Sequence, residues 1–223
     1  MKVIEHLPVH REVEVTSIAD AAEFYPRISG LRFNYVIRVG SSSPDSSKLT
    51  SESDRFFLKV IRFQSDLIVS TGSTARSESL KASKYAPLLL LTNQDELNCP
   101  ATREQSEQRV FVTLENQTFK NPNAQSIGKT EQPLQTWLRS FTVEHKFSNI
   151  VIETGLTVTK ELLAAENSSE FCLSVTGADS SSDAASNAMD FLSELNIQPE
   201  LIQLLEVEGT YLFRFDLTQQ NQQ

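Results

Sequence analysis

Cysteine and histidine are scarce in this sequence, which has two cysteines and three histidines among 223 residues. Cys99 and Cys172 provide neither a disulfide framework nor a spaced thiolate metal site. Both fall in or beside apolar segments, where buried thiols are common. Three histidines are few ligands for a histidine-based metal site. The sequence therefore predicts structural cysteines and no metal site.

Long hydrophobic runs and clustered basic charge are missing too. No run approaches the roughly 18 apolar residues of a membrane span. The N-terminal stretch MKVIEHLPVHREVEV alternates charged and apolar residues and lacks the apolar core of a signal peptide. The net charge of −9 argues against a general nucleic-acid or anionic-membrane surface, since both need clustered cations. We expect a cytoplasmic protein that binds neither.

The spacing of the hydrophobic residues predicts strands that alternate with helices along the chain. Apolar runs rich in β-branched and aromatic residues predict strands at Phe33–Val39, Asp66–Val69, Pro87–Thr92, Val110–Leu114, Asn149–Ile152, Phe171–Val175 and Tyr211–Phe215. Helical spacing predicts helices at Ser53–Arg62, Leu134–Phe141, Thr157–Ala165 and Ala185–Leu195, with Ser51, Thr157 and Ser182 as caps.

This order of elements indicates an α/β fold with a mostly parallel central sheet flanked by helices. The closely spaced end, from Ile202 to Phe215, predicts an antiparallel hairpin. The length suits one domain over residues 1–223, with an N-terminal arm at 1–15 and a frayed tail at 218–223.

Three polar stretches interrupt the pattern and are expected to be loops: 41–53, 116–133 and 176–187. Their serine, asparagine and proline content cannot support a core, so the simplest interpretation is solvated connections. For the stretch at 41–53, the alternative is a mobile flap over a site.

Two short turns leave a predicted strand and enter a helical segment. The first offers Thr71, Gly72, Ser73 and Thr74, and the second Glu153–Thr157. Such turns bind phosphates in α/β sheets, because free backbone N–H groups and the positive helix end face the ligand there. Alternatively, each glycine simply supplies a positive φ or a helix cap. Taken together, the two turns could hold the two ends of a dinucleotide.

The segment 49–78 resembles the strand, preceding helix and Gly-Ala-Gly-Thr-Val-Arg-Ala-Glu turn of a reductase family with a dihydrofolate-reductase-like fold. It is the family of the C-terminal reductase domain of bifunctional riboflavin-biosynthesis deaminase-reductases. Downstream, NIVIETGLTVTKELL resembles its Glu-Gly-Gly-Pro-Thr turn and helix, and LLEVEGTYLFRFDL its closing hairpin. The resemblance covers about residues 15–217. The matching positions are Asn34, Asp54, Arg55, Arg62, Asp66, Thr74, Arg76, Glu78, Glu153, Gly155 and Thr157.

The resemblance implies a three-layer reductase domain and a homodimer that uses NADPH to reduce a ribosylamino-pyrimidine phosphate. It implies cofactor contacts from the two turns, with Thr113–Asn116 near the adenosine end, and it leaves catalytic residues unassigned. The implied cofactor-binding residues are Gly72, Ser73, Thr74, Thr113, Glu153, Thr154, Gly155, Leu156 and Thr157. The implied substrate-binding residues are Asn34, Arg76 and Glu78, although Arg76 could instead be a solvated arginine paired with Glu78.

The chain departs from the family's pattern at several glycine and aspartate positions. Gly40 stands where the first-strand Ser-x-Asp-Gly signature has its aspartate, and Asp45 lies further along. Thr71 and Thr154 each replace a glycine, and Leu156 replaces a proline. Seven glycines are few for a nucleotide-binding fold, since the average share is about 7%. A non-catalytic ligand-binding or interaction protein is therefore the alternative to the reductase.

Overall fold

The computed structural model describes residues 1–41, 48–94, 96–114, 120–121, 123–128, 131–165 and 168–218. The chain divides into two compact units. Unit 1 comprises Met1–Ile28, Arg32–Ile61 and Asn167–Gln223, and unit 2 comprises Ser29–Leu31 and Arg62–Glu166. Strand β3 (Gly30–Arg38) begins in unit 2 and continues in unit 1, and helix α2 (Glu52–Phe63) begins in unit 1 and ends in unit 2. Each unit is described by itself below.

Unit 1 contains six neighbouring strands in the order β2-β1-β10-β11-β9-β3. The pairs β2–β1, β1–β10, β10–β11 and β11–β9 are antiparallel. The strand bounds are β1 Lys2–Leu7, β2 Arg11–Glu14, β3 Gly30–Arg38, β9 Ser168–Thr176, β10 Glu200–Val207 and β11 Thr210–Asp216. The helices are α1 Ile18–Phe24, α2 Glu52–Phe63 and α7 Ser181–Glu194.

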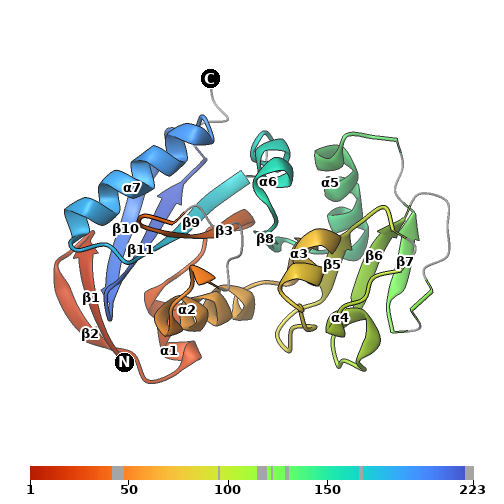
Figure 1. Cartoon of the computed structure of the whole chain (residues 1–223), viewed down its shortest axis with the longest axis horizontal. Coiled ribbons are helices and arrows are strands. Elements are labelled where there is room, and N and C mark those ends of the chain that lie inside the picture. The colour runs from red at the N-terminus through yellow and green to blue at the C-terminus, as the bar shows by residue number, and fades with distance from the viewer. Residues whose placement is uncertain are drawn as a thin grey trace. The chain divides into compact units, whose positions relative to one another are not determined.

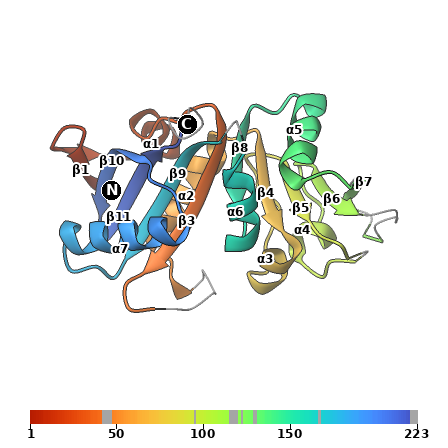
Figure 2. The same cartoon turned by 90° about the horizontal axis from the view of Figure 1, so that it is seen from above.

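Helices cover the two faces of this sheet, with α7 on one side and α1 on the other (Figures 1 and 2). Because side chains alternate along a strand, the residues of β9 divide between the two faces. Phe171 lies toward α7, with its ring 6.1 Å from Phe33 and 6.3 Å from Phe191. On the opposite face Tyr25, which follows α1, packs edge-on against Phe57 of α2 at 5.3 Å.

Polar side chains form a hydrogen-bonded row across the α1 face of the unit 1 sheet. Glu170 of β9 accepts from Arg32 of β3 at 2.6 Å and from Arg214 of β11 at 2.5 Å. Arg214 also donates to Gln203 of β10, whose amide donates to Glu5 of β1 at 2.8 Å. All five are buried, so the row satisfies charges that would be costly to bury alone. We call these five residues the buried polar row.

Unit 2 is built on five parallel strands in the order β8-β4-β5-β6-β7 (Figure 2). Their bounds are β4 Leu67–Thr71, β5 Leu88–Leu91, β6 Val110–Leu114, β7 Gln125–Gly128 and β8 Asn149–Glu153. The helices are α3 Gly72–Ser77, α4 Pro100–Arg103, α5 Leu134–His145 and α6 Leu156–Leu163. Chain order runs outward from β4 to β7, and β8 returns to the other side of β4.

The predicted fold class is confirmed, because helices alternate with parallel strands and β10–β11 close the chain as an antiparallel hairpin. The seven predicted strands all occur within a few residues of their expected bounds. Ser51 is confirmed as a cap of α2, since its Oγ accepts from the backbone N–H of Asp54 at 3.0 Å.

Several local predictions were wrong. Helix α7 begins at Ser181 inside the predicted 176–187 loop, and its N-cap is Ser180 instead of Ser182. Helix α6 begins at Leu156, with Gly155 at its N-cap, so Thr157 is not the cap. Serine is favoured where a helix begins, so the serine-rich stretch from Ser180 forms the start of α7 and not a loop.

The predicted arm and loops also contain regular structure. Residues 1–15 include the paired strands β1 and β2, and β7 lies within the predicted 116–133 loop. Helix α2 begins at Glu52, inside the 41–53 stretch. Residues 42–47 of the proposed flap at 41–53, which include Asp45, and the tail after residue 218 lie outside the described residues. No helix in the described ranges is long and apolar enough to cross a membrane.

Candidate functional site

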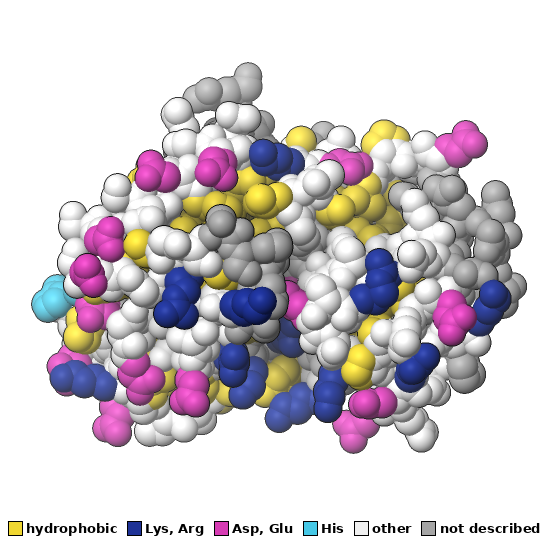
Figure 3. All heavy atoms as spheres, in the orientation of Figure 1, with side chains coloured by type: hydrophobic (Ala, Val, Ile, Leu, Met, Phe, Trp, Pro, Cys, Tyr) yellow, Lys and Arg dark blue, Asp and Glu magenta, His cyan; other side chains and the backbone are white. Residues whose placement is uncertain are grey.

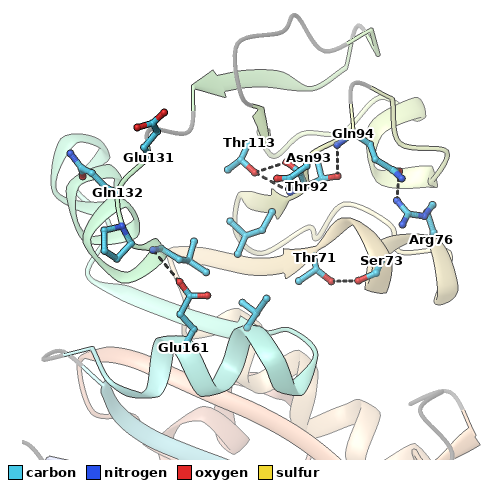
Figure 4. A pocket seen from close by; sticks show the side chains of 14 residues that line it. Thr71, Ser73, Arg76, Thr92, Asn93, Gln94, Thr113, Glu131, Gln132 and Glu161 are labelled. Atoms are coloured by element: carbon cyan, nitrogen blue, oxygen red, sulfur yellow. Dashed lines mark hydrogen bonds between the residues drawn. The ribbon is translucent and has the colours of Figure 1, made fainter.

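A pocket of about 690 Å³ lies in unit 2 at the carboxyl ends of parallel strands (Figure 4). Its volume falls within the roughly 300–1,000 Å³ range of small-molecule sites. Thr71 ends β4, Leu91 ends β5, and Thr113 lies next to the last residue of β6. The lining residues are Thr71, Ser73, Arg76, Leu91, Thr92, Asn93, Gln94, Thr113, Glu131, Gln132, Pro133, Leu134, Val158 and Glu161.

Sheet topology explains why the pocket forms here. Strand β4 has β5 on one side and β8 on the other, so the chain order reverses at β4. The helices that follow β4 and β8, α3 and α6, supply Arg76 and Glu161 to the lining. Open α/β sheets bind ligands in the crevice at such a switch point. The pocket therefore occupies the position that this topology favours for a ligand.

The turn after β4 is fixed by hydroxyl groups and by one close contact. Thr71 is the N-cap of α3, and its Oγ1 accepts from the backbone N–H of Thr74 at 3.1 Å. The same oxygen lies 2.8 Å from Ser73 Oγ. A Cβ added to Gly72 would stand 2.8 Å from Oγ1 of Thr92, closer than real Cβ contacts allow. Glycine is thus required here by the close approach of α3 to the segment after β5.

Thr113, a residue of β6, holds the segment after β5 in place through hydrogen bonds. It is fully buried, and its Oγ1 accepts from the backbone N–H of Thr92 at 2.9 Å. The same hydroxyl lies within donating distance of the carbonyl oxygens of Leu90 and Thr92, at 3.4 and 3.2 Å. Thr92 Oγ1 in turn accepts from the backbone N–H of Gln94 at 3.1 Å, and Gln94 Oε1 accepts from Arg76 at 2.6 Å. A continuous series of hydrogen bonds thus connects the core of unit 2 to Arg76.

The opposite side of the pocket carries carboxylates. Glu161 of α6 accepts from the backbone N–H of Leu134 at 3.2 Å and so caps α5, whose own N-cap, Pro133, makes no side-chain cap bond. Glu131 lies on the same side, away from Arg76 (Figure 4). The pocket therefore has a guanidinium at one side and carboxylates at the other, with Leu91, Leu134 and Val158 as apolar wall.

The second predicted turn, after β8, is engaged in interactions with its own neighbours. Glu153 accepts from Arg62 at 2.8 Å, and its carbonyl accepts from Ser70 Oγ at 2.8 Å. Burial lowers the pKa of Arg62, but the Glu153 carboxylate more than offsets this, so that the pKa of Arg62 is raised overall. Thr154 is buried with its Oγ1 2.9 Å from that of Thr159. These residues do not belong to the pocket lining.

The sequence-predicted residues are therefore only partly brought together. Ser73, Thr113 and Arg76 line the pocket, and Gly72 and Thr74 lie in the same turn. Glu78 is the C-cap of α3, and Arg76 donates to Gln94 Oε1 at 2.6 Å. Asn34 lies on β3 in unit 1. The ligand roles of all these residues stay predictions, and residues 115 and 116 lie outside the described ranges.

Sequence reasoning missed Thr92, Gln94, Glu131 and Glu161. Thr92 closes the predicted strand Pro87–Thr92, so the rule that ligands bind at the carboxyl ends of parallel strands could have found it. The two glutamates carry no such signal, because they come from the segment before α5 and the C-terminal half of α6. Among the described residues, no group of three or more histidine, cysteine or acidic side chains could hold a metal ion.

Comparison with known proteins identifies solved structures with a similar fold. No family model and no curated protein sequence matches the chain. Among solved structures, a pyrimidine reductase-like protein from Corynebacterium diphtheriae aligns with a TM-score of 0.65 and 14% identity, over 84% of this chain and 91% of that one. The riboflavin biosynthesis reductase of Saccharomyces cerevisiae aligns with a TM-score of 0.56 and 8% identity, over 92% of both chains.

A deaminase/5-amino-6-(5-phosphoribosylamino)uracil reductase from Thermotoga maritima aligns with a TM-score of 0.64 and 14% identity. The match covers 84% of this chain and 56% of that one, so the chain spans little more than half of the Thermotoga protein. The chain thus has the fold of pyrimidine reductases, as the sequence resemblance predicts.

Proposed function

We propose that the protein is an NADPH-dependent reductase acting on a ribosylamino-pyrimidine phosphate or a related nucleotide-like compound. The observation that carries the proposal is the pocket at the carboxyl ends of β4, β5 and β6, within a fold shared with pyrimidine reductases. Substrate identity and homodimer formation follow from the resemblance, and the cytoplasmic location expected from the sequence belongs to the same proposal.

The lining has the chemistry that one end of a nicotinamide dinucleotide requires. Leu91, Leu134 and Val158 provide an apolar wall for a base, and Ser73 and Thr71 provide hydroxyls. Arg76 provides a guanidinium, which binds phosphate oxygens in a bidentate manner. Such a mixture of apolar walls and a few placed polar groups is typical of cofactor sites. The residues present therefore fit a nucleotide.

When bound, NADPH would supply the hydride, and the protein would supply binding, orientation and exclusion of water. In this chain, Thr71 and Gly72 hold the start of α3 against the segment after β5. Glu161 holds the start of α5. These contacts fix the pocket walls before a ligand arrives, which reduces the ordering cost of binding.

A titration of the purified protein with NADPH and NADH tests the cofactor assignment directly. We expect micromolar binding of NADPH, followed by NADPH oxidation when a ribosylamino-pyrimidine phosphate is added. Arg103, an exposed arginine at the end of α4 outside the pocket lining, offers a control. Arg103→Gln should leave NADPH binding unchanged. A folded protein that binds neither dinucleotide would contradict the proposal.

A non-catalytic ligand-binding protein is the second candidate, and Gly40 favours it. The resemblance implies an active-site aspartate at this position. Gly40 instead has a φ of +73°, a backbone conformation in which residues other than glycine are strained. NADPH binding without oxidation of NADPH by any pyrimidine, pteridine or quinone acceptor would favour this candidate over the reductase.

A further inference from the structure

Among the described residues that line the pocket, Arg76 is the only lysine or arginine. It is exposed, and its Nη1 donates to Gln94 Oε1 at 2.6 Å. A guanidinium has five N–H donors, so one bond to an amide oxygen orients the group and leaves further donors for an anion. Figure 4 shows Gln94 and Arg76 side by side at one side of the pocket.

We infer that Arg76, positioned by Gln94, binds the 2′-phosphate of the adenosine half of NADPH and so selects NADPH over NADH. This inference rests on the proposed function and assigns Arg76 to the cofactor instead of the substrate. Gln94, which no sequence pattern indicated, is the positioning residue. A 2′-phosphate is the group by which the two dinucleotides differ, and arginine is its usual partner.

The position of Gln94 depends on hydrogen bonds within unit 2. Its backbone N–H donates to Thr92 Oγ1 at 3.1 Å, and the backbone N–H of Thr92 donates to Thr113 Oγ1 at 2.9 Å. Thr113 has no exposure to solvent. The guanidinium is therefore held by a series of bonds that starts in the core, and not by a surface contact alone.

The opposite charges at the two sides of the pocket favour one orientation of a bound ligand. Glu131 and Glu161 lie at the side opposite Arg76 (Figure 4). Carboxylates accept hydrogen bonds from ribose hydroxyls and base amino groups and repel phosphates. A nucleoside with a phosphate at one end and hydrogen-bond donors at the other matches this arrangement, with its phosphate at Arg76.

The test uses adenosine 2′,5′-bisphosphate, which contains the 2′-phosphate without the nicotinamide, against ADP and ribose 5-phosphate, by calorimetry at low ionic strength. The wild-type protein should bind the 2′,5′-bisphosphate about 10- to 100-fold more tightly than ADP, as expected for charge-assisted hydrogen bonds to one phosphate. Arg76→Gln should abolish the difference. Gln94→Leu should reduce it several-fold, and Arg76→Lys should retain part of it.

Arg103→Gln is the matched control, because it removes an exposed arginine outside the pocket. It should leave the preference intact. Circular dichroism should show that Arg76→Gln is folded, since the side chain is exposed. If the wild-type protein does not distinguish the 2′,5′-bisphosphate from ADP, or if ribose 5-phosphate binds at Arg76 more tightly than either, the inference is overturned.

These results also separate the inference from the proposed function. Arg76-dependent binding of the 2′,5′-bisphosphate without any NADPH oxidation would support the inference while the reductase proposal fails. NADPH oxidation with equal use of NADH, unaffected by Arg76→Gln, would support the reductase and overturn the inference.

Discussion

The carboxylate of Glu170 accepts the Nε–H of Arg32 at 2.6 Å, and neither side chain is exposed to solvent. Glu170 also pairs with Arg214, whose guanidinium lies 4.9 Å from the centre of the Tyr25 ring. The two arginines share one carboxylate in the interior of unit 1. Removing a partner from such a group leaves an uncompensated buried charge, which costs more than the pair contributes.

Replacing Glu170 should therefore strongly destabilise the protein. We expect Glu170→Gln to lower the free energy of unfolding by about 3–5 kcal/mol, measured by urea denaturation. The control is Glu12→Gln, which breaks the exposed Lys2–Glu12 pair at 2.7 Å. That variant should change stability by less than about 1 kcal/mol. Equal effects of the two substitutions would contradict a structural role for the buried polar row.

Alanine substitution should have different effects on stability at the two glycines that the resemblance places at the cofactor. Gly72→Ala should cost about 1–3 kcal/mol of stability, because its Cβ meets Thr92. Gly155→Ala should cost less than about 1 kcal/mol, because no atom lies within 4 Å of its added Cβ. If the turn after β8 receives phosphates, Gly155→Ala should nevertheless weaken NADPH binding. Thermal unfolding and NADPH titration measure the two effects separately.

Thr113→Val should lower both stability and cofactor selectivity. Valine keeps the shape of threonine but leaves the backbone N–H of Thr92 without its acceptor, at a cost of about 1–3 kcal/mol. Because Thr92 fixes Gln94, the preference for NADPH over NADH should fall as well. Thr159→Val, which removes a buried hydroxyl elsewhere in unit 2, should lower stability and leave the preference unchanged.

Stability should decline at alkaline pH because of Cys172 and Tyr25. Burial raises the pKa of the Cys172 thiol and raises that of the Tyr25 phenol well above its ordinary value. Both groups hold their protons more tightly in the folded state, so this contribution is complete below the unfolded pKa values of about 8.5 and 10. It is lost as the pH rises through the folded values.

Urea denaturation at several pH values between 8 and about 10.5 measures this decline. A Cys172→Ala/Tyr25→Phe variant should start from a lower stability but show a shallower decline than the wild-type protein. Parallel curves for the two proteins would show that other groups control the alkaline limit.

The sequence predicted the strand-to-helix turn at one side of the pocket because the signal there is local. A buried run ending at Ser70–Thr71 and followed by Gly72 indicates a strand entering a helix. The wall formed by Glu161 could not be predicted, since it depends on β8 returning beside β4, a pairing that joins segments about 80 residues apart. Gln94 was missed because its role requires the hydrogen bond from Arg76, 18 residues earlier.

The N-terminal strand was missed for a different reason. Val3 and Glu5 are buried and alternate with less buried neighbours, which is a strand pattern, but one of the two inward residues is charged. Glu5 is tolerated inside because Gln203 and Arg11 donate to it. Those partners lie 198 and 6 residues away, so the sequence alone offers no reason to bury the carboxylate.

The strand order also determines when each unit can form during synthesis. Apart from Ser29–Leu31, unit 2 is one continuous run of chain, so all five of its strands are complete before β9 has been made. In unit 1, by contrast, β10 and β11 stand between β1 and β9. The ribosome therefore releases β1 and β3 long before β10 and β9, their later partners in unit 1, exist. These strands remain open to chaperones, or to pairing with other chains, until the last third of the protein has been translated.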